Sequence, residues 1–222
     1  MTKNNKVKTK KEYVNIQTPV GIISYPYLAK PDTGRAESSN KYSAEIYIPK
    51  PVFAKEGKDM VEKILKVARE FFKNPKLKMG EFKGPITDMD ATGKPVEDWQ
   101  KGTIRVRAKA TQDNKPTVIG PRKDEETGKF PVWSDEQVAA IKGGDHVRLI
   151  CGVYGYTQQG GGIALGLNFV QFAKEGKALG QGRMKQIEAL DEIEVTVDSP
   201  ADMVDTEDSE DSEDADPMMT FA

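Results

Sequence analysis

The sequence has little of what several protein classes require. Its 222 residues include one cysteine, Cys151, and one histidine, His146, so no internal disulfide can form and a structural zinc site of the Cys/His type is excluded. We expect Cys151 to be a small buried strand residue and His146 to lie on the surface. No apolar run approaches the roughly 18 residues of a membrane helix, and the first residues lack the apolar core of an export signal. These absences favour a reducing cytosol.

Basic residues are missing from the last part of the chain. Residues 188–222 hold 14 acids and no Lys or Arg, which leaves 33 bases and 21 acids, a net charge of +12, in residues 1–187. The formal net charge of -2 is therefore the sum of a basic body and an acidic tail. Such asymmetry is typical of proteins that bind nucleic acid or another polyanion.

The charge pattern also suggests the domain organisation. Residues 1–11 hold five lysines and no acid, so residues 1–12 are predicted to form a flexible basic arm. Residues 13–187 suit a single domain with one core, and residues 188–222 form the acidic tail.

The hydrophobic pattern of the body predicts mainly β-strands. Strict alternation of apolar and polar residues indicates half-buried strands, and a glycine-rich loop joins the last two of them as a hairpin. Pro26 predicts an edge or a bend in the first. The predicted strands are residues 20–28, 41–48, 103–111, 146–156 and 163–172.

Two helices interrupt this pattern. Apolar residues recur at helical spacing in residues 59–73, and residues 134–142 open with a capping box formed by Ser134 and Gln137. Residues 30–40 and 75–102 have no regular period and predict loops. No Lys-Ser or Lys-Thr pair follows the glycine run, so it is not a nucleotide-binding loop, and we expect neither a cofactor nor a metal.

The strand at residues 103–111 carries the clearest candidate site. Arg105, Arg107 and Lys109 alternate with apolar residues, so all three cations point to one face of the sheet. Such a row supplies affinity for phosphates by displacing counterions. The alternative is an ordinary solvated face.

Aromatic residues accompany these cations and offer unpaired bases a surface on which to stack. Tyr154 and Tyr156 share strand parity with Arg148, while the residues between them take the core side. Each aromatic could instead belong to the core. Further candidates are Tyr25, Tyr27, Tyr47 and Trp99, together with Lys30 and Arg35 in the adjacent loop.

The acidic tail ends in an apolar tip. Self-repulsion and a lack of apolar area predict that the acidic stretch is disordered, and the tip resembles a peptide ligand for a partner's pocket. The alternative is a tail that only improves solubility. The residues proposed to bind a partner are Asp211, Glu213, Asp214, Asp216, Met218, Met219 and Phe221.

Several segments together resemble one family. Residues 25–32, Tyr-Pro-Tyr-Leu-Ala-Lys-Pro-Asp, and the strand ending Ile-Tyr-Ile-Pro-Lys at residues 46–50 are similar to the opening of the single-stranded-DNA-binding proteins of tailed bacteriophages. The basic strand, the stretch 141–156 and the acidic tail follow in the same order. The resemblance implies a mainly β OB-fold, a five-stranded Greek-key barrel with one or two helices. It also implies binding of single-stranded DNA in replication, recombination and repair.

The resemblance carries particular residues and partners with it. The family's basic strand residues fall on Arg105 and Arg107, its stacking tyrosine on Tyr156 or Tyr154, and its loop cation on Arg35. Its tails contact the phage DNA polymerase and helicase-primase, and they occupy the DNA cleft when DNA is absent. The family's terminal aromatic is the last residue, whereas here Ala222 follows Phe221. The chain could act as a monomer or as a homodimer. The cytoplasm of the infected bacterial host is the expected location.

Two rival functions come from different classes. Asp88, Asp90, Glu97 and Asp98 could be magnesium ligands of a nuclease, although they lie in a predicted loop. A structural or packaging protein that binds polyanions would also carry a basic body. We expect a binding protein for single-stranded DNA, not an enzyme.

Overall fold

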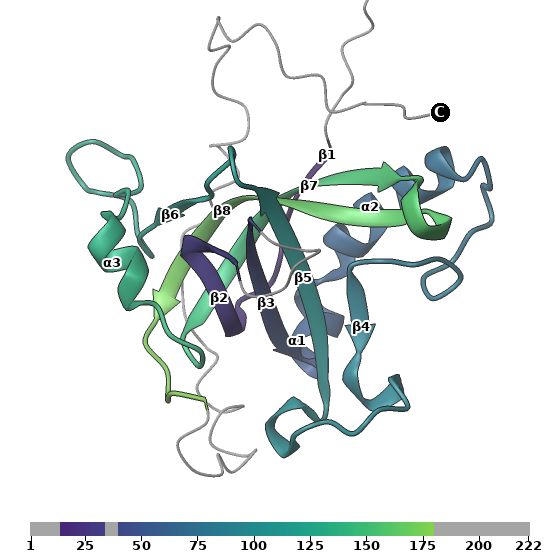
Figure 1. Ribbon diagram of the computed structural model, residues 1–222, viewed down its shortest axis with the longest axis horizontal. Helices are drawn as coiled ribbons and strands as arrows, with labels where there is room; N and C mark the ends of the chain where they lie inside the picture. Colours follow the sequence, from purple (N-terminus) through teal and green to yellow (C-terminus); the bar gives the residue numbers. More distant parts are fainter. Residues whose placement is uncertain (1–13, 34–39, 180–222) are drawn as a thin grey trace, which may run out of the picture.

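The computed structural model describes residues 14–33 and 40–179, which contain an eight-stranded sheet and three α-helices (Figure 1). The predicted basic arm, Arg35 and the acidic tail lie outside the described residues. The strands are β1 (Val14–Gln17), β2 (Gly21–Asp32), β3 (Lys41–Pro49), β4 (Ile86–Asp88), β5 (Thr103–Thr111), β6 (Thr117–Ile119), β7 (His146–Tyr156) and β8 (Gly162–Lys174). The helices are α1 (Lys50–Glu56), α2 (Lys58–Phe71) and α3 (Asp135–Ala140), with 3-10 turns at Met89–Ala91, Asp98–Gln100 and Gln158–Gly160.

Five of the strands pair in a closed ring. β2 pairs with β3, β3 with β5, β5 with β8, β8 with β7, and β7 with β2. All of these pairings are antiparallel except β5 with β8. β1 extends the sheet from β7, β4 pairs with β5, and β6 pairs with β8. The predicted mainly β architecture with few helices is confirmed.

The strands with clear alternation lie where the sequence predicts them. In β3, Tyr42, Ala44, Ile46 and Ile48 are all buried, and Ile46 faces Val106 of β5 across the ladder. The predicted hairpin is formed by β7 and β8, whose ladder runs from the pair Tyr156 and Gly162 beside the connecting loop to the pair His146 and Lys174. Half-buried strands are readable from sequence because their side chains alternate between core and solvent.

The predicted bend in β2 is also confirmed. Tyr25 has a φ of 49°, and the pairing of β2 with β3 shifts register between Ser24 and Tyr27, the segment that contains Pro26. Beyond Ile22, β2 has no further pairing with β7 within the described residues. Proline cannot donate to a ladder, so it is tolerated at such a bulged edge. β2 continues to Asp32, into the segment predicted as a loop.

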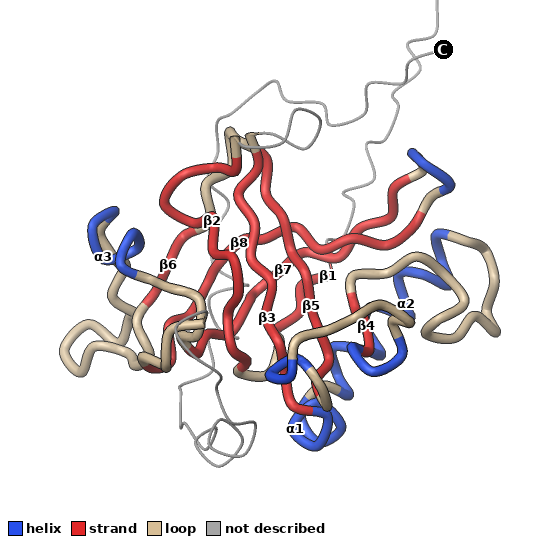
Figure 2. Tube along the Cα trace, turned by 60° about the horizontal axis from the view of Figure 1, so that its bottom comes forward, coloured by secondary structure: helices blue, strands red, loops and turns tan. Residues whose placement is uncertain are grey.

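The helices lie at the periphery of the ring, with α1 and α2 on one side and α3 on another (Figure 2). Met60, Ile64 and Ala68 form the buried face of α2, which packs on β1, β7 and β8. The predicted capping box of α3 is present at Ser134. Helix α1 was not predicted because none of its side chains is fully buried, so it leaves no apolar period. Within the described residues, none of the helices is long and apolar enough to cross a membrane.

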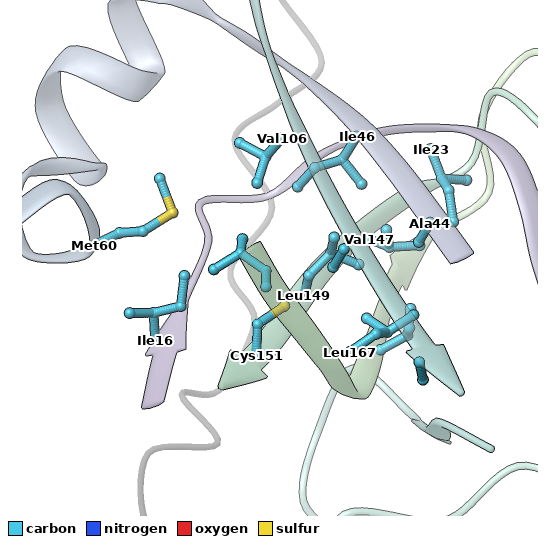
Figure 3. Packing of buried hydrophobic residues seen from close by; sticks show 14 of the residues in the cluster. Ile16, Ile23, Ala44, Ile46, Met60, Val106, Val147, Leu149, Cys151 and Leu167 are labelled. Carbon is cyan, nitrogen blue, oxygen red and sulfur yellow. The ribbon is translucent and has the colours of Figure 1, made fainter. Parts of the chain in front are cut away.

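The core fills the ring and the space beneath α2. Figure 3 shows Met60 of α2 in the same apolar cluster as Ile16 of β1 and Cys151 of β7. Cys151 is fully buried, as predicted, and burial raises the pKa of its thiol far above the usual range. The surface position predicted for His146 is wrong. The chain after β8 folds back over it, where Gly176 donates its backbone N–H to the Asp145 carboxylate at 3.0 Å.

Candidate nucleic-acid interface

One row of outward-facing residues crosses six strands. Residues directly opposite each other in a ladder point to the same side of the sheet, and successive pairings join Tyr27 to Ser43, Ser43 to Lys109, Lys109 to Gly166, Gly166 to Gly152, and Gly152 to Asn15. The neighbours of these residues along each strand include buried core residues, so the row itself faces outward. We call this set the outer row: Tyr27, Ser43, Lys109, Gly166, Gly152 and Asn15.

The basic residues of β5 lie along the outer row, next to an acid of the neighbouring strand β3 that was not a candidate from the sequence. Glu45 of β3 is paired in register with Arg107. Its Oε1 forms an ion pair with Arg107, 2.8 Å from Nε, and its Oε2 lies 3.9 Å from a terminal nitrogen of Arg105. The Glu45 carboxylate therefore lies between two guanidinium groups, at a position that suits an anion.

One end of this surface is closed by aromatic packing. Tyr47 is only 3% exposed, and the ring of Trp99 meets it edge-on with centroids 4.7 Å apart. The Tyr47 hydroxyl accepts from the Gln100 amide at 3.2 Å, and Arg105 donates to the Thr87 hydroxyl at 3.3 Å. Burial, aided by Glu45, raises the pKa of Tyr47. In this arrangement Trp99 is the more exposed ring of the pair.

Lys109 lies near the middle of the outer row. It is half-buried, and its pKa is lowered first by burial and then by the charges of Arg107 and Lys41. Three cations thus repel one another at this position, and a phosphate would relieve that repulsion. Lys41 was not among the residues predicted from the sequence.

The two tyrosines of β7 face the same side. Tyr154 is 45% exposed, and its ring lies beside Gly166 of β8, the residue that pairs with Lys109. The Tyr156 hydroxyl lies beside Gly162. Burial and then the neighbouring Tyr156 raise the pKa of Tyr154, so this ring stays neutral in ordinary buffers. Tyr154 therefore offers an open aromatic surface next to a cation.

Arg148 shares the parity of Tyr154 but is separated from it. Ile150 lies between them and is 2% exposed, because it packs in a second apolar cluster with Ile119 and Phe130. Burial lowers the pKa of Arg148, although Glu56 acts in the opposite direction. Lys30 is exposed on the last part of β2.

Other residues of this surface escaped the sequence analysis. Asn15 and Asn168 lie on either side of Gly152, and their positions depend on strand register, which alternation alone does not give. A lysine-rich segment lies next to Tyr156, since Ile163 of β8 donates its backbone N–H to the Lys83 carbonyl at 2.9 Å. Its exposed lysines are Lys73, Lys76, Lys78 and Lys83.

The carboxylates considered for a nuclease are engaged elsewhere. Asp88 and Asp90 both bind the Lys50 ammonium at 2.7 Å, and Asp98 binds Lys101 at 2.6 Å. Glu97 accepts from the indole N–H of Trp99. Among residues 14–33 and 40–179, no group of three His, Cys, Asp or Glu side chains could hold a metal ion.

Comparison with known proteins identifies the relatives of this chain. Residues 14–204 match the model of the Enterobacter phage Enc34 ssDNA-binding protein family. The solved structure of the bacteriophage Enc34 single-stranded DNA-binding protein in complex with ssDNA has a TM-score of 0.61 and 21% identity, covering 75% of this chain and 89% of that one. The same protein without DNA has a TM-score of 0.58 and 21% identity, covering 79% and 89%.

A single-stranded DNA-binding protein encoded by bacteriophage T7 is more distant, with a TM-score of 0.47 and 21% identity, covering 77% of this chain and 97% of that one. A search of curated proteins finds no significant match. The Enc34 structures show that this chain shares their fold.

Proposed function

Because the chain belongs to the family of phage single-stranded DNA-binding proteins represented by that of Enterobacter phage Enc34, we propose that it coats single-stranded DNA along the outer row. Its role is that of a binder, not of an enzyme. The single observation that carries the proposal is that the exposed ring of Tyr154 lies beside Gly166, the partner of Lys109. One place on the surface thus combines a stacking platform with phosphate-binding cations.

The proposed mechanism has little sequence preference. Arg107 and Lys109 contact phosphates, while Tyr154 and Tyr156 stack on bases, and every base has a face that can stack. The closed ring of five strands supports an OB-fold barrel, in which oligonucleotides cross the strands of one face. Residues 13–187 would then form the DNA-binding domain, and Arg35 in the β2–β3 loop, Lys30 and Trp99 would border the path.

The acidic tail is proposed to regulate this surface. Residues 188–222 are tethered to a body of net charge +12, so they compete with DNA phosphates at high effective concentration. DNA would displace the tail and free Met218, Met219 and Phe221, with the acids Asp211, Glu213, Asp214 and Asp216, for the phage polymerase and helicase-primase. We propose that the protein acts in this way in replication, recombination and repair, in the cytoplasm of the infected host.

The experiment that tests the function compares DNA forms. Fluorescence anisotropy with a labelled dT oligomer and a duplex of equal length should show tighter binding to the single strand at the same salt concentration. A preference for the duplex would instead favour a packaging protein. Incubation of both DNAs with magnesium should leave them intact, whereas cleavage would indicate a nuclease.

A further inference from the structure

Two glycines of the outer row have room for a side chain. Gly152 and Gly166 face each other in the β7–β8 ladder, in the interior of both strands. Glycine in a strand interior weakens the strand, because it loses more backbone entropy on folding than other residues and has no side chain to pack. It is retained where the backbone needs a positive φ, where a neighbour excludes a β-carbon, where the strand bulges or bends sharply, or where a ligand approaches closely.

The first two reasons do not apply to this pair. Neither glycine has a positive φ, unlike Gly144 or Gly161. A β-carbon on Gly166 would lie 3.7 Å from both the Gly152 carbonyl oxygen and the Tyr154 ring, and one on Gly152 would lie 3.7 Å from Asn15 Oδ1 and 3.8 Å from Asn168 Nδ2. These are ordinary van der Waals distances, so alanine fits at both positions.

Other glycines of the same hairpin behave differently. A β-carbon on Gly155 would lie 2.2 Å from the Phe71 ring, and one on Gly162 would lie 2.6 Å from the Lys83 carbonyl oxygen. At those positions the fold itself excludes a side chain. The register shift of this ladder lies between Ile150 and Cys151, whereas Gly152 and Gly166 pair regularly beyond it, so neither is the bulged residue. Close approach of a ligand is then the reason that best fits both glycines.

The groups around the pair suit a nucleobase. Tyr154 flanks Gly166 with an exposed ring, and the amides of Asn15 and Asn168 converge on Gly152 from two sides. Lys109 pairs with Gly166 on the opposite edge of β8. Aromatic, amide and ammonium groups can respectively stack on a base, hydrogen-bond its edge and hold the adjoining phosphate.

We propose that Gly152 and Gly166 form the floor of a nucleobase subsite, in which a base stacked on Tyr154 approaches the strand backbone too closely for a β-carbon. This inference rests on the proposed binding of single-stranded DNA. It assigns to the glycine pair a role in affinity and none in stability.

The test uses the full-length protein with Gly166→Ala and Gly152→Ala. The matched control is Gly143→Ala, at a glycine that also lacks a positive φ and whose β-carbon would lie 3.6 Å from Leu179, its nearest neighbour. Thermal unfolding should show that all three variants are folded with melting temperatures at or above that of the wild type. Affinity for a dT oligomer should fall about 10-fold in the two floor variants, within the range of one lost base stack, and stay unchanged in the control.

A second probe identifies the bound group. On an oligomer whose central nucleotides are abasic, the floor variants should bind as the wild type does. Three results would each overturn the subsite. The floor variants could bind dT as tightly as the wild type, they could lose as much affinity for the abasic strand as for dT, or both could fail to fold. If the wild type and Gly143→Ala do not bind dT at all, the proposed function itself fails.

Discussion

The Glu45 carboxylate forms an ion pair with Arg107, 2.8 Å from its Nε, on the surface proposed to bind DNA. An acid at this position holds the guanidinium in a fixed orientation, and it also competes with the phosphate that the guanidinium would bind. If DNA binds at this surface as proposed, Glu45 lowers the affinity below what the cations alone would give.

Replacing this acid should strengthen DNA binding. We expect Glu45→Gln to raise the affinity for a dT oligomer by roughly 5-fold, about 1 kcal/mol, and to steepen its dependence on salt, because a guanidinium freed from its acid can neutralise a phosphate. Asp59→Asn changes the net charge equally but removes only an exposed pair with Lys63 on α2. A salt titration by anisotropy distinguishes them, and equal behaviour of the two variants would contradict a competing role for Glu45.

The two arginines of β5 should differ in their effects. Arg107 is the more exposed, whereas Arg105 also donates to Thr87 beside the packed Tyr47. Arg107→Ala should weaken binding to every sequence and flatten the salt slope by roughly 0.7. Arg105→Ala should lower the melting temperature more. If instead Arg105→Ala flattened the salt slope more and Arg107→Ala lowered the melting temperature more, phosphates would bind at the end of the surface near Tyr47.

Lys109 should make binding sensitive to alkaline pH. Its folded pKa is lowered by burial and by neighbouring cations, so the charged form costs the fold stability below that pKa. This cost declines as the pH rises from the folded pKa to the higher pKa of the unfolded chain. The phosphate contact, which needs the charged form, is lost over the same rise. Affinity measured at constant ionic strength should therefore fall at a lower pH in the wild type than in Lys109→Arg. Superimposable profiles would place the phosphate elsewhere.

Removal of the acidic tail should tighten DNA binding. Deleting residues 188–222 takes away 14 acids, and the gain in affinity should be largest at low salt, where the attraction between tail and body is least screened. A tail of equal length with Asn and Gln in place of the acids should behave like the deletion. Unchanged or weaker binding by both variants would rule out competition by the tail.

Parts of this fold and site could be predicted from the sequence because they are local. The alternation that places Arg105, Arg107 and Lys109 on one face is a property of a single half-buried strand, and the cap at Ser134 spans one turn. The pairing of Lys109 with Gly166 depends on register between strands distant in the chain, so the outer row could not be derived. Burial of His146 likewise requires the chain that returns after β8.

The separation of Arg148 from Tyr154 illustrates the same limit. Strand parity correctly places both on one side of β7, but parity does not reveal that a second apolar cluster covers Ile150 between them. Similarly, the aromatic character of Tyr47 is visible in the sequence, whereas its packing against Trp99 is a tertiary contact.

The most direct test of the account is the affinity of Tyr154 variants for a dT oligomer. This exposed ring, proposed to stack on a base, lies beside Gly166, the residue that pairs with Lys109 of β5. Tyr154→Ala should lose about 1 to 3 kcal/mol, or roughly 5- to 150-fold in affinity, while Tyr154→Phe, which keeps the ring, should bind as the wild type does. Affinity for duplex DNA should change little in either variant. Wild-type affinity of a folded Tyr154→Ala for the single strand would contradict the proposed binding surface.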